Sequence, residues 1–325
     1  MKRTMMKKWF AAWLCLALAF SMAAAFPAYA EGKSLSVVAT VFPVWDWTRE
    51  IVGGAEGVNL MLLMENGVDM HSFQPGVSDM MAIASCDVFI YIGGESDEWV
   101  KDALAESVNP DLVAVNLMEA LGSDAMMEEH PEGMEDSHGE KETEAPEKDE
   151  HIWLSLRNAA KLVRVIADAL AKADPARAEQ YRLNADNYAA KLQDLDGEYA
   201  RMVAEAPLNT VLFGDRFPFL YLVRDYGLNY FAAFSGCEAE TEASFETVIF
   251  LAEKVQELGL PTVLVIEGSD GRIAETIASN TAGEAPAVLM MNSMQGVTAA
   301  DIKNGASYLG IMEQNLEVLR QALTP

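Results

Sequence analysis

The sequence predicts an α/β protein of two lobes, each a mostly parallel sheet flanked by helices, bridged by one long rigid helix. Short β-rich runs alternate with helical patterns in both halves of the chain, which is typical of parallel strands joined by crossover helices. The chain of 325 residues is long enough for two domains, and 51% of its residues are hydrophobic. Three cysteines are too few for a fold held together by disulfides.

The first lobe is expected over residues 31–155. Its predicted strands are 36–40, 59–63, 88–92 and 112–115, and its helices begin near Trp45, Val77 and Glu98. Ligands of such sheets bind beyond the carboxyl ends of the strands.

The second lobe is expected over residues 207–325. Its predicted strands are 210–213, 230–234, 262–266 and 287–290. Its predicted helices are 217–226, 244–258, 271–281 and 300–323.

A helical region over 156–206 lies between the lobes. Asp174 followed by Pro175 is a typical helix start. The apolar residues that follow recur at spacings of three and four, which predicts one buried helix face: Tyr181, Ala185, Tyr188, Leu192, Leu195 and Tyr199. A helix over 174–204 would be roughly 45 Å long. A coiled-coil dimer is the alternative, but the stripe covers few heptads.

Residues 1–30 have the pattern of a secretory signal peptide. Four basic residues precede an apolar run, and Ala28, Tyr29 and Ala30 form the small-x-small cleavage pattern. An uncleaved membrane anchor is the alternative, although the apolar run is short for a membrane span. Leu14 before Cys15 does not fit a lipoprotein signal, so no lipid anchor is predicted. The protein is therefore expected to be exported, to the periplasm or the outer face of the cell membrane.

Charge is the extreme feature of the composition. The chain has 23 Lys and Arg against 50 Asp and Glu, giving a net charge of −27. A nucleic-acid partner is excluded, because phosphate binding needs a basic surface, and cations are favoured instead. Twelve of the acids lie within residues 122–150, a predicted acidic loop that also contains His130 and His138. The loop is either a solvated charge run or a loose metal-capture segment.

Two further histidines lie outside the loop interior and point to a metal site. His71 follows the second predicted strand, and His151 stands where the acidic loop ends. Imidazole nitrogens favour zinc and similar transition metals, and carboxylates complete such sites. The sequence thus favours zinc, with manganese as the alternative.

Longer motifs around these histidines resemble one family. Residues 68–75 (VDMHSFQP), residues 150–154 (EHIWL) and the acidic loop between them resemble the zinc/manganese solute-binding proteins of ABC importers, the cluster A-I or zinc-uptake binding proteins. The resemblance covers nearly the whole chain after residue 30. It implies two α/β lobes bridged by a rigid helix, a metal between the lobes, delivery to an ABC permease in the membrane, and a monomer. It also implies that His71 and His151 are the first two metal ligands.

The second-lobe half of the family's site is different in this chain. The resemblance implies that Gly214 occupies the third ligand position and that the fourth lies in residues 292–295, where Asn292 is an amide. Three residues are candidate replacements: Glu267, Cys237 and Asp215. The alternatives are that Asp215 is a structural partner of Arg216, that Glu267 is a structural acid, and that Cys237 has no ligand role.

Other function classes stay open at this point. No H-E-x-x-H, G-x-S-x-G or phosphate-binding glycine loop occurs in the sequence, so an enzyme is not expected. A surface or adhesin-type protein of the same fold that buffers metal through its acidic loop is one alternative. A relative rebuilt for a non-metal anion, clamped by Arg216, is the other.

Overall fold

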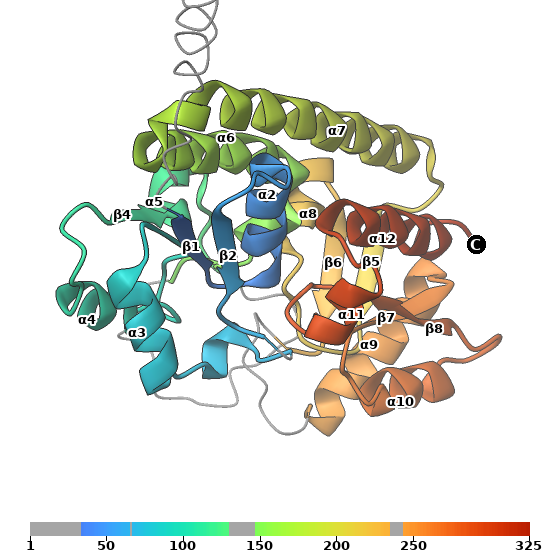
Figure 1. Cartoon of the computed structure of the whole chain (residues 1–325). Helices are drawn as coiled ribbons and strands as arrows, with labels where there is room; N and C mark the ends of the chain where they lie inside the picture. The colour runs from blue at the N-terminus through green and yellow to red at the C-terminus, as the bar shows by residue number, and fades with distance from the viewer. Residues whose placement is uncertain (1–33, 66, 130–146, 235–242) are drawn as a thin grey trace, which may run out of the picture. The chain divides into compact units, whose positions relative to one another are not determined.

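Two four-stranded parallel sheets form the framework of the computed structural model, which describes residues 34–65, 67–129, 147–234 and 243–325 (Figure 1). The predicted signal peptide, His130, His138 and Cys237 lie outside the described residues. The first sheet has the order β2-β1-β3-β4, and the second has the order β6-β5-β7-β8. All pairings within these sheets are parallel, which confirms the predicted fold class.

The strands of the first sheet are β1 (Leu35–Ala39), β2 (Val58–Leu62), β3 (Val88–Tyr91) and β4 (Val113–Asn116). Its accompanying helices are α2 (Phe42–Val52), α3 (Val77–Ser85), α4 (Val100–Ala105) and α5 (Leu117–Leu121). The strand order reverses between β1 and β3, and the crevice beyond this point is where ligands of such sheets bind.

The second sheet contains β5 (Thr210–Phe213), β6 (Asn229–Ala232), β7 (Thr262–Ile266) and β8 (Ala287–Met291). Its helices are α8 (Leu220–Tyr226), α9 (Phe245–Leu258), α10 (Arg272–Asn280), α11 (Ala299–Lys303) and α12 (Tyr308–Ala322). The two central strands, β5 and β7, are buried at every residue and largely apolar, as is typical of the inner strands of a parallel sheet.

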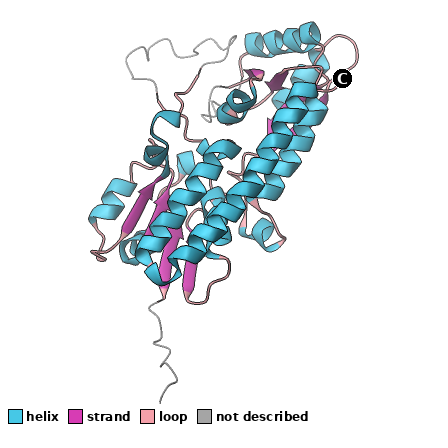
Figure 2. Cartoon of the chain, turned by 90° about the horizontal axis from the view of Figure 1, so that it is seen from above, coloured by secondary structure: helices cyan, strands magenta, loops and turns pink. Residues whose placement is uncertain are grey.

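Two long helices lie side by side across the fold: α6 (Leu156–Ala173) and α7 (Ala178–Glu205) (Figures 1 and 2). A short 3-10 turn, η4 (Pro175–Arg177), leads into α7, so the helix begins close to the predicted Asp174. All six residues of the predicted apolar stripe are at most 5% exposed. The helix packs on α2 beside the first sheet and on α8 and α12 beside the second, so it joins the two lobes.

One predicted helix is interrupted. The span 300–323 contains α11 and α12, separated at residues 304–307. Gly305 has a φ of 95°, which no helix accommodates, and the Ser307 hydroxyl then caps a new helix by accepting a hydrogen bond from the Gly310 N–H at 3.2 Å. The prediction of one continuous helix was therefore wrong at this turn.

Candidate metal centre

His71 lies in a 3-10 turn, η1 (Met70–Ser72), on the loop that follows β2. The Asp69 carboxylate caps this turn, because its Oδ1 accepts a hydrogen bond from the His71 N–H at 3.1 Å. The cap fixes the backbone of His71 while leaving 30% of its side chain exposed. The second predicted histidine approaches it from a different part of the chain.

His151 is completely buried just before the 3-10 turn η3 (Ile152–Leu154). The Asp149 Oδ1 atom accepts a hydrogen bond from the His151 N–H at 2.8 Å and lies 2.9 Å from its Nδ1. An ionised carboxylate can only accept hydrogen bonds, so we assign the ring hydrogen to Nδ1. The Nε2 atom of the neutral ring then carries the lone pair that a metal needs.

The two rings meet at these Nε2 atoms, which are 3.3 Å apart. The Nδ1 atom of His71 lies 2.9 Å from the Ser96 hydroxyl oxygen and 3.6 Å from Glu150 Oε2. Both rings are therefore held from behind by oxygen atoms, and their Nε2 atoms face one another. Two nitrogens bound to one tetrahedral zinc at about 2.05 Å are separated by about 3.3 Å. The pair thus already has the spacing of two zinc ligands.

Glycine is required in the loop that supports His71. Glu150 Oε1 accepts a hydrogen bond from the Ser96 N–H at 2.9 Å. Gly94 has a φ of 93°, and a Cβ atom there would lie only 2.1 Å from Glu150 Oε1. The close approach of Gly94 lets Glu150 bind the loop after β3, which brings the Ser96 hydroxyl to the His71 ring.

The expected third-ligand position, Gly214, lies against α10. A Cβ atom on Gly214 would lie 2.6 Å from the Ala274 Cα atom in α10, so no side chain fits there. Two residues after Gly214, the side chain of Arg216 reaches the first lobe, where its Nη1 atom is 3.0 Å from Asp69 Oδ2. The Arg216–Asp69 pair therefore connects the second lobe to the turn that carries His71.

Asp215 has a structural environment. Its Oδ1 accepts a hydrogen bond from the Arg216 N–H at 2.8 Å, and its Oδ2 accepts one from the Ile266 N–H at 3.3 Å. The side chain bridges the ends of β5 and β7 and is 8% exposed. Asp215 thus contacts Arg216 through the backbone N–H, while the Arg216 guanidinium pairs with Asp69.

Glu267 organises the turn after β8. Its Oε1 accepts hydrogen bonds from the Ser293 hydroxyl and from the Gln295 and Gly296 N–H groups, and its Oε2 accepts one from the Ser293 N–H at 2.6 Å. The Asn292 Oδ1 atom is similarly used by the Met294 N–H at 2.7 Å. This turn binds the His151 region, because Trp153 Nε1 donates to the Ser293 carbonyl at 2.8 Å.

Within the described part of the chain, no three His, Cys, Asp or Glu side chains are grouped as a ready metal site. His71 and His151 are brought together, whereas the Asp215 carboxylate binds backbone N–H groups and that of Glu267 binds backbone N–H groups and the Ser293 hydroxyl. Cys237, His130 and His138 cannot be placed, since they lie outside the described residues.

Comparison with known proteins gives the family. The zinc-uptake complex component A family (ZnuA, periplasmic) matches residues 37–322. The chain belongs to the ZnuA family.

Several ZnuA-like proteins can be compared over 90% of the chain. The high-affinity zinc uptake system protein ZnuA of Bacillus subtilis is 30% identical over 293 residues, which are 89% of its length. The zinc-binding protein AdcA of Streptococcus pyogenes serotype M3 is 31% identical over 297 residues. The match covers 56% of AdcA, so the chain spans about half the length of this curated relative.

Solved structures agree with this assignment. The crystal structure of the Zn(II)-bound ZnuA-like domain of Streptococcus pneumoniae AdcA is similar with a TM-score of 0.70 and 27% identity, covering 90% of this chain and all of that one. The metal-dependent lipoprotein YcdH of Bacillus subtilis gives a TM-score of 0.72, 27% identity and the same coverage. Among the described residues, no helix is both long and apolar enough to cross a membrane.

The ZnuA family resemblance did not reveal the groups that hold the histidines. Asp149 was counted only as part of the acidic run, and Glu150 was also part of the EHIWL motif, but neither was given a supporting role although both stand next to His151. Asp69 lies in the VDMHSFQP motif, but neither Asp69 nor Ser96 was predicted from the sequence to support the histidines. Their roles depend on loops from β2 and β3 meeting at one edge of the sheet.

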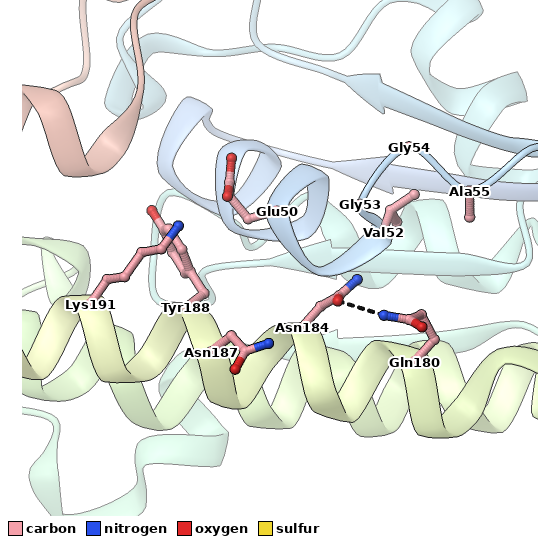
Figure 3. Close-up of a pocket in the computed structure, with 10 residues that line it drawn as sticks. All are labelled: Glu50, Val52, Gly53, Gly54, Ala55, Gln180, Asn184, Asn187, Tyr188 and Lys191. Carbon is pink, nitrogen blue, oxygen red and sulfur yellow. Dashed lines mark hydrogen bonds between the residues drawn. The ribbon is translucent and has the colours of Figure 1, made fainter.

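Two pockets occur elsewhere. One, of about 350 Å³, lies between the end of α2 and α7 and is lined by amide side chains and by Glu50, Tyr188 and Lys191 (Figure 3). The other, of about 370 Å³, borders the turn after β8 and includes Glu267 and Asn292. His71 and His151 line neither of these pockets, so the histidine pair is a separate feature.

Proposed function

We propose that this protein is an extracytoplasmic solute-binding protein that captures zinc with His71 and His151 and delivers it to an ABC permease. The observation that carries the proposal is the 3.3 Å separation of the two Nε2 atoms. A neutral imidazole that carries its hydrogen on Nδ1 offers an Nε2 lone pair, so this spacing allows one cation to bind both nitrogens.

The chemistry of the donors favours zinc over manganese as cargo. Imidazole nitrogen suits zinc, whereas manganese prefers carboxylate, carbonyl and water oxygens. The Bacillus subtilis and Streptococcus relatives are named as zinc proteins, which supports the same choice. A net charge of −27 also favours a cation, because it raises the local concentration of positive ions at low salt.

Family membership supports the wider biological role that we propose. ZnuA proteins are transport proteins rather than a class of enzymes, so we propose a carrier without catalytic activity. We propose that residues 1–30 are a signal peptide, that residues 31–155 and 207–325 form the two lobes, and that 156–206 join them. The permease partner and a monomeric state belong to the same proposal.

The charge on Arg216 bears on the anion-binding alternative. Its guanidinium pairs with Asp69, and the two side chains are 24% and 27% exposed. An anion would have to displace this carboxylate to be clamped by Arg216. The zinc proposal needs no such rearrangement, and for this reason we prefer it.

The test is a competition titration of zinc against a chromophoric chelator. We expect one tight site in the unmodified protein and at least a 100-fold loss of affinity in His71→Ala and His151→Ala, since even supporting residues of metal sites contribute about 10- to 100-fold. The control is the double variant His130→Ala, His138→Ala, which should keep the tight site. Loss of that site only in the control would favour the metal-buffering alternative.

Cys237 is tested in the same titration. Cys237→Ser should leave zinc affinity unchanged if the site is built on the histidine pair. A large loss in Cys237→Ser would instead make the thiolate a ligand, because zinc binds Cys sulfur tightly.

A further inference from the structure

The two ends of the acidic segment pair with each other beside the histidines. Residues 126–128 and 147–149 form a short antiparallel contact, which we name the stem. Its centre is the bridge between Met127 and Lys148. The Glu128 N–H donates to the Glu147 carbonyl at 2.8 Å, and the Asp149 N–H donates to the Met126 carbonyl at 3.0 Å.

The second lobe holds the stem in place. The Tyr221 hydroxyl accepts a hydrogen bond from the Met126 N–H at 2.9 Å and donates one to the Asp149 carbonyl at 2.8 Å. Glu129, the last described residue before the gap, forms an ion pair with Arg224 and accepts a hydrogen bond from the Tyr230 hydroxyl at 3.3 Å. The stem is therefore fixed on α8 and β6 at both ends.

The pairing decides which side chains face the histidines. Successive residues of an extended strand point to opposite faces, and residues directly opposite each other in a pair share a face. Glu128 is opposite Glu147, and its diagonal neighbour on that face is Asp149. Since the Asp149 carboxylate contacts the His151 ring, the face that carries Glu128 is the face toward the histidine pair.

The charges around Glu128 agree with this placement. Burial, and to a lesser extent the nearby Asp149, raises the pKa of its carboxyl to about 7, while His151 and His71 act in the opposite direction. Diagonal neighbours in a strand pair lie about 7–8 Å apart, within reach of a long side chain. Among the hydrogen bonds of the described residues, none ends on the Glu128 carboxylate, whereas Asp149 Oδ1 contacts His151 and both oxygens of Glu267 bind the turn after β8.

We propose that Glu128 is the third protein ligand, whose carboxylate moves onto the zinc ion held by the Nε2 atoms of His71 and His151. This inference rests on the proposed function and completes its site. Two nitrogens and one carboxylate oxygen are a usual zinc ligand set and leave a fourth position for water. The Glu128 carboxylate takes the place of the ligands that the family's second lobe is expected to supply. The stem thereby becomes part of the metal site.

The test compares zinc affinity in the full protein and three variants. Glu128→Gln removes the charge and keeps the size of the side chain. Glu128→Asp keeps the charge but withdraws the oxygens by one methylene. Glu119→Gln, an exposed residue of α5, controls for the loss of one negative charge. We expect both Glu128 variants to lose about 100-fold in zinc affinity and Glu119→Gln to stay within threefold of the unmodified protein.

The outcomes separate this inference from the function on which it rests. If Glu128→Asp binds as tightly as the unmodified protein while Glu128→Gln is weakened, Glu128 acts only through its charge and the inference is overturned. If neither Glu128 variant is weakened while His71→Ala is, the inference fails and the zinc site stands. If the unmodified protein binds no zinc, both fail. Hydrogen exchange gives an independent readout, because zinc should protect the stem amides in the unmodified protein and not in Glu128→Gln.

Discussion

Gly94 offers a direct way to disturb the support behind His71 without touching either histidine. In Gly94→Ala the new Cβ would lie 2.1 Å from Glu150 Oε1, far inside van der Waals contact. The backbone φ of 93° adds a conformational cost of about 1–2 kcal/mol for any residue with a Cβ atom. Displacing Glu150 also breaks its hydrogen bond from the Ser96 N–H, and a bond to a charged group contributes about 1.5–3 kcal/mol. We therefore expect the free energy of unfolding to fall by about 3–5 kcal/mol.

The same change should weaken zinc binding. Ser96 and Glu150 both approach the His71 Nδ1 atom, and the loss of such supporting groups lowers metal affinity by about 10- to 100-fold. Gly57→Ala is the matched control, because Gly57 has a φ of 78° and no atom within 4 Å of the added Cβ. It should show only the conformational cost and bind zinc normally. Denaturant unfolding and a zinc titration measure both effects. Equal stability and equal affinity in the two variants would refute the reasoning.

Four further predictions concern other parts of the structure. Trp153→Phe removes the hydrogen bond to the turn after β8 and should lower the free energy of unfolding by about 1 kcal/mol beyond the loss of packing. Glu267→Gln should lower the free energy of unfolding in a urea titration by about 2–4 kcal/mol, because an amide cannot accept all four hydrogen bonds. Zinc affinity should stay within threefold of that of the unmodified protein. Loss of the zinc site in this variant would make Glu267 a ligand. Burial raises the pKa of Asp46 from 3.8 to about 6, so the folded metal-free protein binds a proton at Asp46 more tightly than the unfolded chain. The free energy of unfolding gained from this proton is full below pH 4 and is lost as the pH rises past 6. Asp46→Asn should flatten this part of the profile of stability against pH. Zinc affinity itself should fall as pH drops through about 6.5, since protons compete for His71 and His151; an unchanged affinity at pH 5 would contradict imidazole ligation.

Much of the fold was predictable because hydrophobic periodicity marks the elements. The strands were located within one or two residues, since each is a short β-rich run between polar turns. The stripe from Tyr181 to Tyr199 predicted the joining helix, and its burial confirms that face. The break before α12 was missed, because one glycine within a helical pattern is compatible with a continuous helix. Only the φ of 95° at Gly305 shows that the chain turns there.

The candidate site was predictable only in part. His71 and His151 stand out because histidine is rare in this chain and both follow motifs of the family. The sequence could not show that position 214 has no room for a side chain, since that depends on how closely Ala274 of α10 approaches Gly214. The placement of Glu128 depends on a strand pair closed across 18 intervening residues and held by Tyr221 of the other lobe. Nothing in the local sequence distinguishes Glu128 from the other acidic residues of segment 122–150, so this pairing could not be predicted.

The most direct test of the account is to locate the metal in a crystal of the zinc-loaded protein by anomalous diffraction at the zinc edge. The account predicts one strong peak about 2.0–2.1 Å from the Nε2 atoms of both His71 and His151. A peak bound by only one of these histidines, or by other residues alone, would contradict it.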